Sequence, residues 1–134
     1  MWQLNSPTGL YAITLAEREV FNTHWLHVPS LQVAQTGETF LTLGEQWSLD
    51  ESAWQSDSIV ALTLRKYPGN HTPSDLVATV DCAARTARVG EGAFAPLADL
   101  EQRLDRALTW IYAKPDTAPA PSGLLGALRR FFKG

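Results

Sequence analysis

Histidines are the side chains of this sequence best suited to metal binding. His24 and His27 flank Trp25 and could ligate a metal ion together with a carboxylate if they shared one face of a helix. The β-forming residues around them favour a strand, on which residues three apart point to opposite faces. No His-Glu-x-x-His string, EF-hand loop or paired cysteine motif occurs in the sequence. We therefore predict no metal site and no cofactor.

Two further residues could act in catalysis. His71 lies in the loop of residues 67–75, and loops rich in Pro and Gly host active sites more often than strands do. Cys82 follows Asp81 at the end of a predicted strand, where an acidic neighbour raises the pKa of a thiol, so we interpret Cys82 as buried and unreactive. The sequence contains no nucleophile elbow, phosphate-binding glycine loop or dinucleotide fingerprint. No catalytic residue is predicted, and a small-ligand or enzyme site near the 67–75 loop is kept as an alternative.

A cluster of acids and tryptophans in the middle of the chain suits recognition better than catalysis. Aromatic side chains of a small sheet usually pack in its core, but a mixture of tryptophan and carboxylate also occurs in sugar-binding clefts and in protein interfaces. We favour a partner-binding patch on the folded body, with a carbohydrate or small-ligand pocket as the alternative. Its predicted members are Trp47, Asp50, Glu51, Trp54 and Asp57.

The C-terminal residues 124–134 form a basic amphipathic segment. On a helix its apolar side chains fall on one face, with cations beside or opposite them. A helix of about eleven residues is marginal in water by itself and needs a surface to fold against. That surface could be a groove on another protein, an anionic membrane or the body of the same chain. The residues predicted to contact the partner or membrane are Leu124, Leu125, Leu128, Arg129, Arg130, Phe131, Phe132 and Lys133.

The formal net charge of −3 conceals two parts of opposite sign. Residues 1–114 contain eight Lys/Arg and thirteen Asp/Glu, a charge of −5, whereas residues 115–134 contain three Lys/Arg and one Asp, a charge of +2. Nucleic-acid-binding surfaces need clustered Lys and Arg to contact phosphates, so an acidic body argues against that class of partner. A cationic protein partner suits the body better.

The length and composition predict one folded domain. A chain of 134 residues with 45% hydrophobic and 19% charged residues is long enough for a single core without a disulfide. We divide it into an acidic domain of residues 1–114, a Pro/Ala-rich linker of residues 115–123 and the tail of residues 124–134. The sequence shows no secretory signal and no run of apolar residues long enough to span a bilayer, so we expect a cytoplasmic protein.

The hydrophobic pattern predicts an antiparallel α+β fold. Short β-rich segments follow one another closely, without intervening helices, over residues 10–15, 23–28, 31–34, 39–43, 47–54, 59–65, 76–82 and 86–89. The second segment is expected to stop at Pro29, and the third and fourth form a hairpin around Gly37. From Pro96 the apolar spacing changes to three and four, which predicts a helix over residues 96–113. We expect a curled sheet or small open barrel of six to seven strands, packed by this one C-terminal helix.

The strand, Pro-Gly loop and hairpin in the middle of the chain resemble a known group of proteins. The segments are Leu62–Gly69 and Val77–Val89, and the similarity covers about residues 40–110. They are similar to small β-rich bacterial proteins of uncharacterised function, some of which look like immunity proteins of polymorphic toxin systems. The resemblance implies a non-enzymatic protein that binds a partner, in an immunity-like or accessory role, and it transfers no functional residue. The second hypothesis is a peripheral membrane adaptor anchored by residues 124–134.

Overall fold

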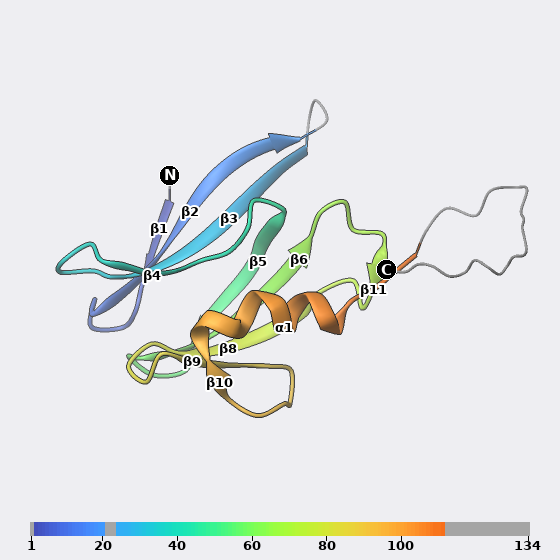
Figure 1. The fold of residues 1–134 in the computed structure, drawn as a ribbon. Coiled ribbons are helices and arrows are strands. Elements are labelled where there is room, and N and C mark those ends of the chain that lie inside the picture. Colours follow the sequence, from blue (N-terminus) through green and yellow to red (C-terminus); the bar gives the residue numbers. More distant parts are fainter. Residues whose placement is uncertain (1, 21–23, 112–134) are drawn as a thin grey trace, which may run out of the picture.

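The N-terminal third of the chain forms one antiparallel sheet. The computed structural model describes residues 2–20 and 24–111, so the predicted linker and tail lie outside the described residues. The first sheet, sheet A, contains β1 (Trp2–Asn5), β2 (Tyr11–Val20), β3 (His24–Val33) and β4 (Thr39–Thr42) in that spatial order. Strands β2 and β3 form a long hairpin that extends away from the rest of the molecule (Figure 1).

The remaining strands form a second sheet and a small strand pair. Sheet B has the order β10-β9-β8-β6-β5, and β11 pairs with β7 beside it. The strands are β5 (Trp47–Trp54), β6 (Ile59–Lys66), β7 (His71–Thr72), β8 (Leu76–Asp81), β9 (Thr86–Val89), β10 (Ala95–Pro96) and β11 (Thr109–Trp110). The prediction of antiparallel sheet with one C-terminal helix is confirmed. The predicted count of six to seven strands is wrong, because the described residues hold eleven strands, three of them only two residues long.

The predicted hairpin around Gly37 is confirmed. Gly37 has a φ of 76°, and its N–H donates to the Val33 carbonyl at 2.8 Å, which closes the turn between β3 and β4. The predicted end of a strand at Pro29 is wrong, since β3 continues through it to Val33. Pairing with β4 begins only at Ser30, so the missing N–H of Pro29 breaks no bond of that ladder.

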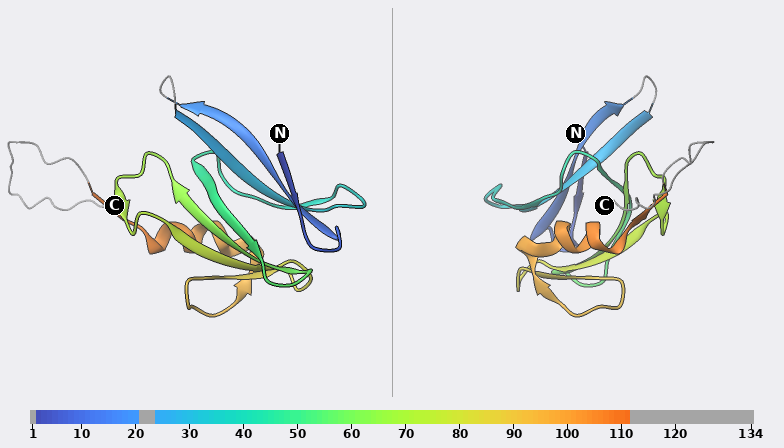
Figure 2. Two further views of the ribbon diagram at one scale, coloured as in Figure 1. Left: turned by 180° about the vertical axis from the view of Figure 1, so that it is seen from behind. Right: turned by 45° about the vertical axis from the view of Figure 1, so that its right-hand side comes forward.

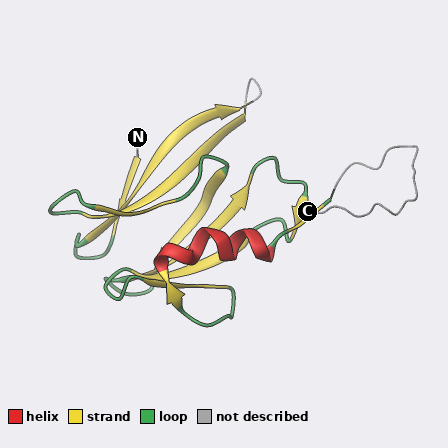
Figure 3. Ribbon diagram, viewed as in Figure 1, coloured by secondary structure: helices red, strands yellow, loops and turns green. Residues whose placement is uncertain are grey.

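The C-terminal helix is shorter than predicted. A 3₁₀ turn, η1 (Leu97–Asp99), leads into α1 (Leu100–Ala107), and the chain is extended again at Leu108. The backbone then pairs with β7, and the Ile111 N–H donates to the Asn70 carbonyl at 2.8 Å. Strand pairing therefore replaces the last turns of the predicted helix. Helix α1 lies against sheet B near β9 (Figures 2 and 3).

One apolar cluster joins both sheets and the helix. Its completely or almost completely buried members come from β2, β3, β5, β6, β8, β9 and α1, and include Ile13, Leu31, Trp47, Leu62, Leu64, Leu100 and Leu104. Two carboxylates of α1 fix the helix over this cluster. Glu101 accepts a hydrogen bond from the Gly44 N–H at 2.9 Å, and Asp105 lies 2.6 Å from the ammonium of Lys66. The helix is thereby tied both to β6 and to the connection between β4 and β5.

Removal of one helix side chain from this cluster should destabilise the whole protein. Leu104→Ala is expected to lower the free energy of unfolding by about 2–5 kcal/mol, because a fully buried leucine leaves a cavity between the helix and the sheets. Urea denaturation measures the change. The matched control is Gln102→Ala, an exposed position of the same helix, which should change stability by less than about 0.5 kcal/mol. Equal effects of the two substitutions would contradict the assigned packing of α1.

Candidate functional site

The predicted patch of acids and tryptophans does not form one surface. Trp47 is 0% exposed and belongs to the core, so its predicted role in partner binding is corrected. It lies on the core-facing side of β5, and Lys66 stands over its ring at 5.5 Å. Trp54 is partly buried and packs against the same cluster. The two tryptophans face the core because large aromatic rings are needed to fill the space between the sheets.

The acids of the predicted patch have separate roles. Asp57 accepts hydrogen bonds from the backbone N–H and the hydroxyl of Thr8, which ties the β5–β6 turn to the β1–β2 turn. Asp50 lies at a bulge in β5 and pairs with Arg65 at 3.3 Å. Of the five predicted residues, Glu51 is the one that lines a shallow depression of about 440 Å³ on the outer surface of β5 and β6. Of the five predicted residues, Asp50 and Glu51 are exposed at the surface.

The β2–β3 hairpin presents a different acidic and aromatic surface. Its register pairs Glu17 with His27 and Glu19 with Trp25, so these four residues share one face. Trp25 is 54% exposed, and Glu17 lies 3.9 Å from the imidazole of His27. We call this set, Glu17, Glu19, Trp25 and His27, the hairpin face. An exposed tryptophan between carboxylates is an arrangement suited to binding a cationic partner.

Sequence reasoning missed the hairpin face because it depends on register. The sequence places the acids and Trp25 in separate segments, and nothing local says which of them lie opposite each other. Pairing a β2 of ten residues with a β3 of equal length would have brought them together. The predicted first strand ended at residue 15, which left Glu17 and Glu19 outside it and hid that alignment.

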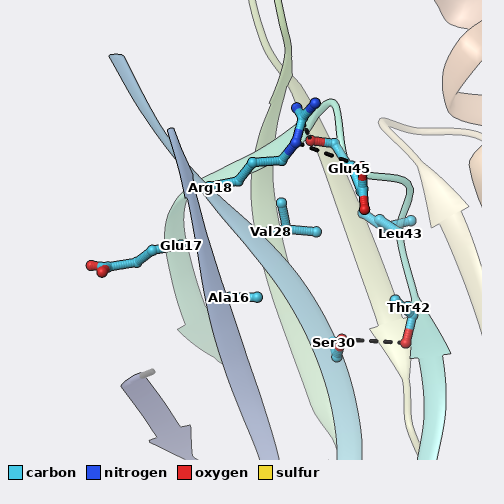
Figure 4. A pocket seen from close by; sticks show the side chains of 8 residues that line it. All are labelled: Ala16, Glu17, Arg18, Val28, Ser30, Thr42, Leu43 and Glu45. Atoms are coloured by element: carbon cyan, nitrogen blue, oxygen red, sulfur yellow. Dashed lines mark hydrogen bonds and ion pairs between the residues drawn. The ribbon is translucent and has the colours of Figure 1, made fainter. Parts of the chain in front are cut away.

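A groove lies mainly on the other side of the same hairpin, and Glu17 of the hairpin face also lines its edge. It has a volume of about 460 Å³ and runs between the hairpin and the connection that follows β4 (Figure 4). Ala16, Val28 and Leu43 are its apolar residues. Arg18 crosses toward Glu45, with 3.6 Å between the guanidinium and the carboxylate, and the Ser30 and Thr42 hydroxyls are 3.2 Å apart. The groove therefore has an apolar base and a polar rim, with Arg18 and Glu45 at one end and Glu17 on another side (Figure 4).

His71 has a structural role. The imidazole is 3% exposed, with Nδ1 at 2.7 Å from the Pro73 carbonyl and Nε2 at 2.9 Å from the Lys66 carbonyl. Its ring also meets Trp110 edge to face at 5.0 Å between centroids. Both ring nitrogens are thus engaged by backbone, and the ring holds the 67–75 loop against β11. The described part of the loop offers no exposed histidine to a substrate.

Cys82 is a buried thiol, as predicted. Its exposed fraction is 0%, and burial, followed by the charge of Asp81, raises the pKa of the thiol to about 12. Thiolate, the reactive form, is therefore scarce at neutral pH. Within residues 2–20 and 24–111 no group of three or more His, Cys, Asp or Glu side chains could hold a metal ion. No helix in this part of the chain is long and apolar enough to cross a membrane.

Neither family models, nor curated proteins, nor solved structures gave a match to the chain. The resemblance to immunity-like proteins accordingly stays a prediction.

The bond between Asp57 and Thr8 should make stability depend on pH. The hydrogen bonds from Thr8 hold the pKa of the Asp57 carboxyl below its usual value of 3.8. Because the pKa of Asp57 is lower in the folded than in the unfolded protein, its ionised carboxylate stabilises the fold. This stabilisation is complete above the pKa of Asp57 in the unfolded chain and is lost as the pH falls through its pKa in the folded protein. The stability difference between the wild type and Asp57→Asn should therefore narrow below about pH 4. Denaturation midpoints at a series of pH values measure it, and a constant difference would contradict the assignment.

The burial of Cys82 predicts slow modification. In the folded protein at pH 8, a thiol reagent such as iodoacetamide should label Cys82 far more slowly than a free cysteine, because the thiol is both buried and protonated. In urea the same residue should react at the ordinary rate, and mass spectrometry distinguishes the two. Rapid labelling without denaturant would show that Cys82 is accessible.

Proposed function

We propose that this protein is a non-enzymatic protein-binding factor, in an immunity-like or accessory role, that docks on a cationic partner through the hairpin face. The observation that carries the proposal is the 54% exposure of Trp25 on the same face as Glu17 and Glu19. Tryptophan is among the commonest anchors of protein interfaces. Leaving a ring of this size in water costs free energy, which burial against a partner recovers.

The chemistry of the face favours arginine or lysine on the partner. A guanidinium can stack on an indole ring, and a carboxylate beside the ring can accept hydrogen bonds from the same group. Glu19 is exposed, and Glu17 has a 44% exposed side chain, so both can reach a partner. The described residues hold seven Lys/Arg and thirteen Asp/Glu, a formal charge of −6, which attracts a cationic surface over a longer range.

The interior side chains support a binding role over an enzymatic one. The histidine of the 67–75 loop is enclosed by backbone carbonyls, and the single cysteine is buried and protonated. The groove and the shallow depression contain no histidine or cysteine. An immunity-like protein needs only a rigid complementary surface, and a long hairpin anchored in an apolar core supplies one.

Substitution of Trp25 should abolish partner binding without unfolding the protein. Full-length Trp25→Ala is expected to raise the Kd for the partner at least about thirtyfold, the effect of losing an interface anchor. The partner is first captured from the source cell with the wild type, and the purified pair is then measured by titration calorimetry. The double variant Glu17→Gln, Glu19→Gln should weaken binding and reduce its dependence on salt.

Two substitutions elsewhere serve as controls. Leu10→Ala changes an apolar side chain of similar exposure, 45%, in the β1–β2 turn, and Glu38→Gln changes an exposed acid in the β3–β4 turn. Both should bind as the wild type does. An unchanged Kd for Trp25→Ala, or an equal loss of affinity in both controls, would contradict the proposed docking face.

The tail supports a second proposal, a peripheral membrane adaptor. Residues 124–134 contain five large apolar residues and three cations without any acid, a composition typical of segments that bind anionic bilayers. Flotation of the full chain with vesicles containing phosphatidylserine should then exceed flotation with neutral vesicles. Equal absence from both vesicle fractions eliminates the adaptor.

A further inference from the structure

The groove of Figure 4 combines an apolar base with carboxylates at its rim, the two features that a basic amphipathic segment needs. It is formed by the β2–β3 hairpin and by residues 42–45, which Glu101 fixes through its bond to the Gly44 N–H, and its rim carries Glu17 and Glu45. Ala16 is exposed at its surface, while Val28 and Leu43 are 7% and 2% exposed at its base. Its volume of about 460 Å³ leaves room for apolar side chains above this base.

The chain carries a segment of matching composition close at hand. Residues 124–134 have five large apolar side chains and a formal charge of +3, and the described residues carry −6. Twelve residues separate Ile111, the end of the described body, from Leu124. A Pro-rich connection rises about 3.1 Å per residue, so twelve residues span about 37 Å. A domain of this size is about 35 Å across, so the groove lies within reach.

We propose that the groove between the β2–β3 hairpin and residues 42–45 binds residues 124–134 of the same chain. The apolar residues Leu124, Leu128 and Phe131 enter the groove, and the cations of the segment meet the carboxylates at its rim. A tethered segment is present at an effective concentration in the millimolar range, so even a weak contact is occupied. This contact does not depend on the hairpin face having a partner.

The charges at the rim agree with a cationic occupant. Glu45 has an 80% exposed side chain and lies 3.6 Å from Arg18, which is 40% exposed. An ion pair this exposed contributes little to stability and exchanges readily. Glu45 can therefore turn from Arg18 to an arginine of the segment at small cost.

Disulfide trapping in the full chain tests the contact. Thr42 is exposed and lines the groove, and Thr42→Cys paired with Ala127→Cys keeps every apolar and charged residue of the segment. The matched control is Thr72→Cys with Ala127→Cys. Thr72 is also an exposed strand threonine, and it lies directly opposite Thr109, beside the point where the tail leaves the body. An undirected tail would therefore reach Thr72 at least as often as Thr42. The native Cys82 does not interfere, because it is buried.

The expected result is a monomeric disulfide that forms at least about fivefold faster at Thr42 than at Thr72 under mild oxidation. Ala16→Lys in the groove should slow the Thr42 reaction at least about threefold through charge repulsion and lost apolar contact. Ala53→Lys in the depression on β5 and β6 should leave it unchanged. Equal rates at Thr42 and Thr72 overturn the proposal. So does a disulfide that forms only between two copies, or a Thr42 rate that Ala16→Lys leaves unaltered.

Discussion

The arrangement of the molecule depends on burial of one apolar cluster that no single element could bury alone. Sheet A supplies Ile13 and Leu31, sheet B supplies Leu62 and Leu64, and the short helix α1 completes the enclosure. Eight residues of helix are too few to be stable in water, so α1 exists because its leucines are covered. Trp47 occupies the centre of this arrangement with none of its surface exposed.

Polar contacts then fix how the two sheets meet. The Ser48 hydroxyl oxygen accepts a hydrogen bond from the His27 N–H at 3.0 Å, and Thr8 donates to Asp57 at the turns. The first joins β3 of sheet A to β5 of sheet B, and the second joins the β1–β2 turn to the β5–β6 turn. Residues 24–28 of β3 pair with β2 but have no β4 beside them, so this outer half of the hairpin extends from the body. The same constraint leaves one face of the hairpin exposed and turns the other toward residues 42–45.

One hairpin carries both of the proposed recognition surfaces. The face with Trp25 is exposed and acidic, and suits a partner that brings cations. The groove behind it is apolar at its base, and suits a segment that brings leucine and phenylalanine. The groove and the hairpin face share β2 and β3, and Glu17 contributes to both.

The sequence by itself determined the antiparallel strands, the Gly37 turn, the burial of Cys82 and the leucine spacing of α1, because these follow from local turn chemistry and periodicity. Only the tertiary structure decided which tryptophans are buried and which is exposed. Trp47 and Trp54 face the core, whereas Trp25 faces water, and the alternation of a strand cannot say which face a second sheet will cover. The tertiary structure also decided where the helix ends. The apolar pattern assigned Thr109 and Trp110 to the helix, but their backbone groups pair with β7.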